Sequence, residues 1–202
     1  MILENGKHPL ASGKLAAVVT SLGMLAPPAT PPMAAPDGVT LDRITQPDSA
    51  WYLSLFRAIG APWLWTSRLK MPIAELNDIL THPDVHIHAV RKDGQDIGLV
   101  ELDFRRPDCN EIAFFGLIST ATGQGYGRWM MEQAIAKAFT HRKIRLFLHT
   151  CTLDSPAALP FYQRCGFRAY ARAVEILDDP RLGQLLPDST APHIPIITAE
   201  EL

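Results

Sequence analysis

The spacing of apolar and polar residues predicts strands and helices arranged around one long apolar strand. Residues Glu111 to Ser119 include the apolar stretch from Ile112 to Ile118, which has the length expected for a strand buried on both faces. Other strands are predicted at residues 39–44, 85–91, 98–104, 144–151 and 167–177, and helices at residues 49–59 and 72–81. Turn residues at Asp93-Gly94 and at Arg106-Pro107-Asp108 make the three strands from residue 85 to residue 119 antiparallel neighbours.

Three glycines follow the long apolar strand. Gly123, Gly125 and Gly127 occupy alternate positions, and after them Met130 to Phe139 shows the three-and-four spacing of an apolar helix stripe. The first turn of a helix leaves N–H groups unpaired and carries positive potential, and glycines let an anion approach it. The spacing fits neither the P-loop nor the dinucleotide fingerprint. The junction therefore predicts either a phosphate cradle or a glycine-rich helix entry that binds nothing.

A second junction lies at residues 144–167. The strand 144–151 leads into a short helix, for which Ser155 is the predicted N-cap and Pro156 the first helical residue. Gly166 followed by apolar Phe167 is typical of a helix C-terminal cap.

Both junctions carry a resemblance to a known family. Gly125-Tyr126-Gly127 fits the loop pattern Gln/Arg-x-x-Gly-x-Gly/Ala. The pattern Ala-x-x-Phe/Leu-Tyr-x-x-x-Gly-Phe is matched without a gap by Ala158, Phe161, Tyr162, Gly166 and Phe167. With these motifs in order, the chain resembles the GNAT superfamily of N-acetyltransferases over about residues 40–178. It departs from the family pattern at Thr122 (usually Gln or Arg), at Ser155 (usually Asn) and at Pro160, which should kink the short helix.

The resemblance implies an α+β fold with a mixed, mostly antiparallel twisted sheet flanked by helices. We expect this acetyltransferase domain at residues 38–178, after an N-terminal strand and a proline-rich linker at residues 1–37. Residues 179–202 are expected to pack back as a tail. The apolar stretch 15–25 is interrupted by polar residues and favours a folded strand, with a signal peptide or a disordered segment as the alternatives. Whether that strand extends the sheet or pairs with a second copy in a homodimer stays open.

The resemblance further implies acetyl-CoA as the donor, an amine as the acceptor and no metal. The residues that the family pattern places against the coenzyme are Phe115, Gly116, Leu117, Thr122, Gly123, Gln124, Gly125, Tyr126, Gly127, Arg128, Ser155, Ala158 and Phe161. Backbone N–H groups of the loop would bind the pyrophosphate, and the strand near Phe115 would pair with the amide-rich pantetheine arm.

Tyr162 stands at the family's general-acid position. A phenol has an ordinary pKa of about 10, so it holds its proton at neutral pH and can give it to the leaving thiolate. Its alternative role is packing. Two glutamates are alternatives for the base: Glu111 falls where the histone-acetylating branch has its catalytic glutamate, and Glu101 shares a strand face with Asp103. Asp103 is predicted as a further base candidate or as a contact for a cationic substrate.

The helix–loop–helix at residues 49–81 corresponds to the part of the family that lies beside the acceptor site. Trp63 and Trp65 are therefore predicted substrate contacts, with core packing as the alternative. His86 and His88 share one strand face, but neither carboxylate nor cysteine completes a ligand set, so packed or solvated histidines are expected.

The composition limits which partners and which cellular location are expected. The 202 residues suffice for one sizeable core, and the formal net charge of −2 lacks the basic footprint of a nucleic-acid partner. Apolar runs stay shorter than the roughly 18 residues needed to cross a membrane. Three cysteines do not make a disulfide framework, and free thiols suit the cytoplasm.

Three functions remain open from the sequence. The first is acetyl transfer from acetyl-CoA to the primary amine of a small molecule, the second is acetylation of a protein lysine or N-terminus, and the third is a non-catalytic acetyl-CoA-binding regulatory module.

Overall fold

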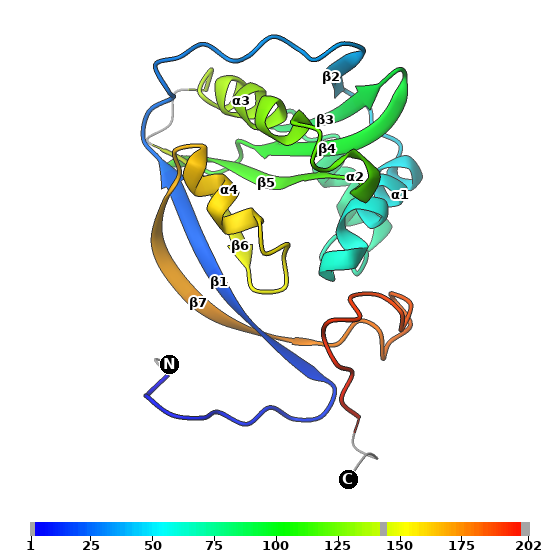
Figure 1. Ribbon diagram of the computed structural model, residues 1–202. Coiled ribbons are helices and arrows are strands. Elements are labelled where there is room, and N and C mark those ends of the chain that lie inside the picture. Colours follow the sequence, from blue (N-terminus) through cyan, green and yellow to red (C-terminus); the bar gives the residue numbers. More distant parts are fainter. Residues whose placement is uncertain (1–2, 142–144, 199–202) are drawn as a thin grey trace.

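The computed structural model describes residues 3–141 and 145–198, which form a seven-stranded mixed sheet with helices on both faces (Figure 1). The strands are β1 (Lys14–Met24), β2 (Val39–Ile44), β3 (Val85–Lys92), β4 (Gln95–Asp103), β5 (Cys109–Leu117), β6 (Arg145–Cys151) and β7 (Arg168–Asp178). The helices are α1 (Ser49–Gly60), α2 (Ile73–Leu80), α3 (Tyr126–Ala138) and α4 (Ala158–Arg164), with short 3₁₀ turns η1 (Ala61–Trp63) and η2 (Ser119–Ala121). The strand order is β2-β3-β4-β5-β6-β1-β7.

Two apolar cores hold the helices to the sheet. Helices α3 and α4 cover one face, where Met130 of α3 packs with Leu102 and Leu146 of the sheet. Helices α1 and α2 cover the other face, where Phe56 packs with Leu99. The alternation of apolar side chains along β4 thus feeds both cores, as expected for a central strand.

Strands β5 and β6 run parallel and pair only at their beginnings. Their register runs from Cys109 opposite Arg145 to Glu111 opposite Phe147, although both strands continue beyond these residues. A β-bulge in β5 lies directly after the last pair, because Ile112 opposes Leu102 of β4 while Phe114 opposes Glu101. A bulge bends its strand and increases its twist. The two strands therefore part after Glu111, and the gap between them opens toward Leu117 and Cys151.

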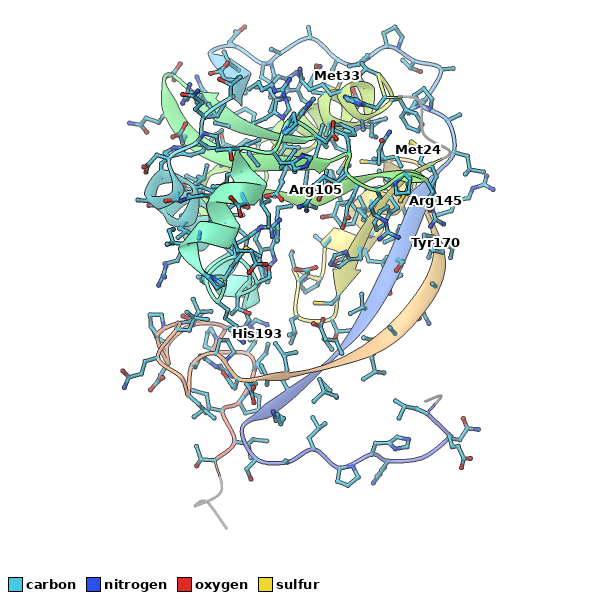
Figure 2. All side chains as sticks on the ribbon, turned by 180° about the vertical axis from the view of Figure 1, so that it is seen from behind. Met24, Met33, Arg105, Arg145, Tyr170 and His193 are labelled. Carbon is cyan, nitrogen blue, oxygen red and sulfur yellow. The ribbon has the colours of Figure 1, made fainter. Side chains whose placement is uncertain are left out.

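The N-terminal strand lies inside the sheet. β1 runs antiparallel to both neighbours, pairing with β6 over Val19–Met24 and with β7 over Lys14–Gly23. Leu22 and Met24 are buried in the core beneath α3 and α4. The predicted strand is therefore present, and it joins the sheet as an inserted strand between β6 and β7. The proline-rich linker that follows crosses α3, where Met33 lies against the helix (Figure 2).

Several predicted boundaries need correction. Helix α4 begins at Ala158, two residues later than predicted, because Ser155 forms a separate turn in which its hydroxyl accepts from the N–H of Ala157 at 3.3 Å. Pro160 then falls in the first helical turn, ahead of the first intrahelical donor, Phe161, so its missing N–H interrupts no helical bond. The predicted start of β6, Ile144, lies outside the described residues.

The C-terminal cap of α4 and the tail follow the sequence pattern. Gly166 has a φ of +99°, and the N–H of Phe167 bonds to the carbonyl of Tyr162 at 3.1 Å.

In the tail, the buried Arg181 pairs with Asp179 and donates to the carbonyls of Thr190, Ala191 and Ile194. Leu186 and Ala191 of the tail pack with Leu15 and Leu64, so the tail folds back on the domain.

The inserted position of β1 predicts a large stability loss when its inward face is cut back. Leu22→Ala removes a side chain that is 0% exposed and should lower the free energy of unfolding by about 2–5 kcal/mol in urea titrations. Val18→Ala, on the same strand but 41% exposed, is the matched control and should lower it by less than about 1 kcal/mol. Equal effects at the two positions would contradict a buried central strand.

Candidate active site

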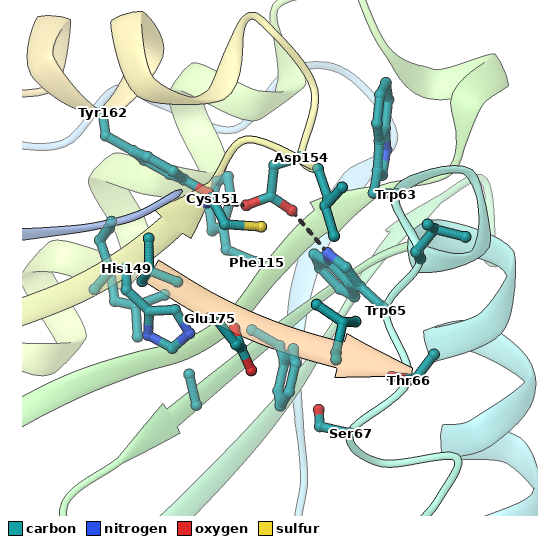
Figure 3. Close-up of a pocket in the computed structure, with 18 residues that line it drawn as sticks. Trp63, Trp65, Thr66, Ser67, Phe115, His149, Cys151, Asp154, Tyr162 and Glu175 are labelled. Atoms are coloured by element: carbon teal, nitrogen blue, oxygen red, sulfur yellow. Dashed lines mark hydrogen bonds between the residues drawn. The ribbon is translucent and has the colours of Figure 1, made fainter. Parts of the chain in front are cut away.

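Two cavities meet where β5 and β6 part. One, here called the inner pocket, has a volume of about 200 Å³ and opens beside the loop after α1 (Figure 3). The other, the loop groove, has a volume of about 510 Å³ and runs along the glycine loop before α3. The residues that line both cavities are Trp63, Trp65, Phe115, Asp154 and Tyr162. The two cavities are therefore neighbours with common walls, so ligands in the groove and in the pocket would lie close together.

The loop groove is shaped for an anion at the start of α3. Gly123 and Gly125 have φ values of +78° and +85°, and a Cβ added to either would meet no atom within 4 Å. A Cβ added to Gly127 would point between the side chains of Leu117 and Phe161, at 3.9 and 4.0 Å. Arg128 and Arg164 supply positive charge at the groove. The open N–H groups, the helix dipole and these guanidinium groups together suit a phosphate.

Most residues predicted to contact the coenzyme line this groove. They are Phe115, Gly116, Leu117, Thr122, Gly123, Gly125, Gly127, Arg128, Ser155, Ala158 and Phe161. Two predicted side chains turn elsewhere. Gln124 donates to the carbonyl of Thr120 at 2.9 Å, and Tyr126 packs against the core under α3. The side chains of these two residues therefore do not line the groove.

Tyr162 lies where the two cavities join. Helix α4 holds its ring in edge contacts with Phe161 and Phe115, at centroid distances of 5.5 and 6.3 Å. Burial raises the pKa of its phenol, and the nearby charge of Asp154 raises it further. The hydroxyl therefore stays protonated at neutral pH and is turned toward Asp154 and Cys151 (Figure 3).

Asp154 is a site residue that sequence reasoning missed. Its Oδ1 accepts from the indole N–H of Trp65 at 3.0 Å, and its Oδ2 accepts from the hydroxyl of Thr150 at 2.6 Å and from the N–H of Cys151 at 3.0 Å. These bonds tie the loop after β6 to the loop after α1 across the joint of the two cavities (Figure 3). The only local signal was a carboxylate one turn after a strand end.

The two predicted tryptophans line both cavities, and Trp65 also packs against the apolar core beneath α1 and α2. Trp65 lies against Phe56 and Phe114 with centroid distances of 5.4 Å, and it also faces both cavities. A Cβ at Gly60 would come within 2.5 Å of the Trp65 ring, so the end of α1 is shaped around the indole. Trp63 lines both cavities from η1.

The structure removes Glu101 from the candidate bases. Its side chain is 0% exposed, accepts from the hydroxyl of Tyr52 at 2.5 Å and forms an ion pair with Arg68. The Arg68 guanidinium lies 5.0 Å from the ring centroid of Phe114, a wall of the inner pocket. The prediction that Glu101 is a base is therefore wrong, because the carboxylate is enclosed and supports the pocket from behind.

Asp103 is likewise committed to a neighbour. Its two carboxylate oxygens accept from the guanidinium of Arg105, and it lies outside the walls of both cavities. The structure therefore gives no basis for the predicted contact between Asp103 and a cationic substrate.

Glu111 remains near the site, at the point where β5 and β6 separate. Burial raises the pKa of its carboxyl, while His149 acts in the opposite direction. Its Oε1 lies 4.0 Å from Nδ1 of His149, and His149 lines the inner pocket. Glu111 thus reaches the pocket through this imidazole. His149, Cys151 and Glu175 are further polar pocket residues that the sequence did not single out.

The described part of the chain has neither a metal-binding cluster nor a membrane-spanning helix. Across residues 3–141 and 145–198, no three His, Cys, Asp or Glu side chains are grouped so that they could hold a metal ion. Within those ranges, no helix has the length and apolar character needed to cross a bilayer.

Comparison with known proteins identifies relatives of this arrangement. A sequence profile of the Acetyltransferase (GNAT) family matches residues 52–167, more than half of the chain. Among curated proteins, none matches the sequence.

Solved structures share the fold at low identity. A putative GNAT acetyltransferase from Novosphingobium aromaticivorans has a TM-score of 0.58 and 18% identity, covering 85% of this chain and 71% of that one. A GNAT acetyltransferase from Elizabethkingia anophelis with acetyl-CoA bound has a TM-score of 0.52 and 17% identity, covering 71% of this chain and 100% of that one. A functionally unknown protein from Staphylococcus epidermidis reaches 0.60 and 16% over 82% of this chain, which spans 63% of its length. The predicted α+β fold is confirmed.

The enclosed Glu101 predicts a structural defect when its charge is removed. Glu101→Gln leaves the Arg68 guanidinium buried without a counter-charge and should lower the free energy of unfolding by about 3–5 kcal/mol in denaturant. Asp93→Asn breaks the exposed pair with Lys92 and should leave the unfolding midpoint nearly unchanged. A Glu101→Gln protein as stable as the parent would show that this carboxylate is not a structural support.

Proposed function

The chain belongs to the GNAT acetyltransferase family, and we propose that it transfers an acetyl group from acetyl-CoA to the primary amine of a small molecule. The observation that carries this proposal is the meeting of the loop groove and the inner pocket at Tyr162. A groove for the donor and a separate, smaller pocket for the acceptor are what a direct transfer between two substrates requires.

The residues of the loop groove fit the coenzyme. Acetyl-CoA, when bound, supplies an activated acetyl thioester. Backbone N–H groups from Gly125 to Gly127 would donate to its pyrophosphate, with the side chains of Arg128 and Arg164 balancing the charge. The part of β5 near Phe115 has lost its pairing with β6, so its backbone is free to bind an extended amide chain as a neighbouring strand would.

Proton transfers would use residues from both sides of the gap. The amine nitrogen attacks the acetyl carbon, and a new C–N bond forms as the C–S bond breaks. Tyr162 would give its phenolic proton to the departing sulfur. His149, backed by Glu111, would accept the proton that the amine loses. A backbone N–H of the exposed β5 segment would steady the oxygen of the tetrahedral intermediate.

The size and charge of the inner pocket favour a small cationic amine. Its volume of about 200 Å³ suits a compact group, and Asp154 and Glu175 bring negative charge to walls that are otherwise largely aromatic or aliphatic. Indole and phenol rings also attract cations through their faces. Acetylation of a protein side chain and a purely coenzyme-binding role remain the alternatives, and transfer assays separate all three.

Location and assembly also belong to the proposal. Cys109, Cys151 and Cys165 are free thiols, which supports a reducing, cytoplasmic setting. The exposed edge strand β7 supports the expectation of a homodimer, since an unpaired edge can pair with a second copy. Nucleic acid and membrane are not among the proposed partners.

The acid role of Tyr162 predicts a loss of turnover without a loss of binding. Tyr162→Phe keeps the ring and its packing, so the Kd for acetyl-CoA should change little, while kcat should fall by roughly 10²–10⁴-fold. The measurement is free-thiol release from acetyl-CoA against a panel of amines. Tyr170→Phe, at a half-exposed tyrosine of β7, is the matched control. If the protein binds the coenzyme but acetylates none of the amines in the panel, the non-catalytic alternative is favoured. An unchanged kcat for Tyr162→Phe would show that Tyr162 is not the general acid.

The base assignment predicts a particular pH dependence. Glu111 can support His149 only as a carboxylate, and burial raises the pKa of Glu111, so its contribution should be present above that raised pKa and disappear as pH falls through it. Glu111→Gln should lower kcat/KM by roughly 10²–10⁴-fold at neutral pH, with partial recovery at high pH as free amine becomes abundant. Glu175→Gln removes a pocket carboxylate and should raise KM while keeping the parental pH profile. A Glu111→Gln profile identical to the parent would exclude Glu111 as the support of His149.

A further inference from the structure

A proline-rich segment adds a third cavity next to the loop groove. Residues Pro27 to Met33, here called the strap, cross the outer side of α3 (Figures 1 and 2). Between strap and helix lies a cavity of about 350 Å³, here called the strap cavity. The strap precedes the residues matched by the family profile, which begin at residue 52. The cavity is therefore built partly from chain that lies outside the matched region.

The strap is fixed to α3 at one residue. The N–H of Met33 donates to Oε2 of Glu132 at 2.9 Å, and Nε2 of Gln133 donates to the carbonyl of Met33 at 3.1 Å. Four prolines restrict the strap backbone on either side of a bend at residues 29–30, so little further ordering is needed for a ligand to bind there. The strap therefore forms a preformed wall across the cavity from the helix.

The walls of the cavity suit a flat, largely apolar group. Four proline rings of the strap lie opposite Ile135 and Ala136 of α3, and Cys165 at the end of α4 completes the floor. The polar side chains in the wall are those of Thr30, Arg128 and Glu132, and the Glu132 carboxylate already accepts from Met33 and Arg128. Heteroaromatic rings bind well to such surfaces because both faces can pack against aliphatic atoms.

Arg128 connects this cavity to the loop groove. It lines both, and its Nε donates to Oε1 of Glu132 at 2.6 Å. The residue thus stands between the proposed pyrophosphate site at the start of α3 and the apolar strap cavity. A ligand that carries a phosphate followed by a planar ring would place the first in the groove and the second under the strap.

We propose that the strap cavity receives the adenosine end of the coenzyme. This inference rests on the proposed function, because acetyl-CoA continues beyond its pyrophosphate into a phosphorylated ribose and an adenine. The adenine would pack between the strap prolines and Ala136, and Arg128 would face the ribose phosphate. The N-terminal segment then contributes to donor binding as well as to the sheet.

Truncated ligands test this proposal by calorimetry. Coenzyme A and 4′-phosphopantetheine share the arm and one phosphate, and only coenzyme A carries adenosine. Ala136→Phe fills the cavity from α3 and should weaken coenzyme A binding by about 10- to 100-fold, the range of a lost base-stacking contact, while phosphopantetheine binding stays within about 2-fold. Lys137→Phe adds the same ring one residue later, outside the cavity, and should weaken neither.

The outcomes separate this inference from the proposed function. Equal weakening of both ligands by Ala136→Phe, or weakening of neither, would overturn the strap assignment while leaving coenzyme binding intact. A parent protein that binds neither ligand would instead contradict the proposed function, and the strap assignment with it.

A measurement on the unmodified protein covers the case in which Ala136→Phe fails to fold. Coenzyme A should slow hydrogen exchange at the amide of Met33 at least about 10-fold more than saturating phosphopantetheine does, because only the longer ligand holds the strap down. Equal protection by the two ligands would overturn the proposal.

Discussion

The end of pairing between β5 and β6 is the constraint on which the site depends. Parallel strands normally stay bonded along their shared length. Here the bulge after Glu111 turns β5 away from β6, so that Glu111 opposite Phe147 is the last pair. The separation leaves unpaired backbone along β5, opens a passage through the sheet and places groove and pocket on either side of it. Tyr162 projects from α4 into this opening, and Asp154 reaches it from the loop before α4. The single bulge in β5 therefore determines where the donor site, the acceptor site and the acid lie.

The inserted N-terminal strand β1 supports the gap from the side of β6. β1 bonds to β6 as far as Val19 opposite Cys151, and to β7 past Glu175, so it fixes two polar walls of the inner pocket. Val19 itself lines the pocket. The same segment then continues across α3 as the strap. Sheet stability and the shape of the site therefore depend on one stretch of chain near the N-terminus, even though the family motifs all lie far downstream.

The parts of the site that could be predicted from sequence are those fixed by local geometry. The alternating glycines permit the left-handed backbone found at Gly123 and Gly125, and Gly166 caps α4 through the same property. The parts that could not be predicted depend on contacts between distant residues. Glu101 resembles a catalytic carboxylate until Arg68 and Tyr52 close over it. The position of β1 between β6 and β7 is a choice of partners that no periodicity encodes.

The most direct test of this account is a crystal structure of the protein with coenzyme A bound. Electron density for the pantetheine arm is expected in the gap between β5 and β6, hydrogen-bonded to the backbone of β5 near Phe115, with the pyrophosphate at the start of α3 and the sulfur near Tyr162. Coenzyme density on another surface, with the gap closed by renewed pairing of the two strands, would contradict it.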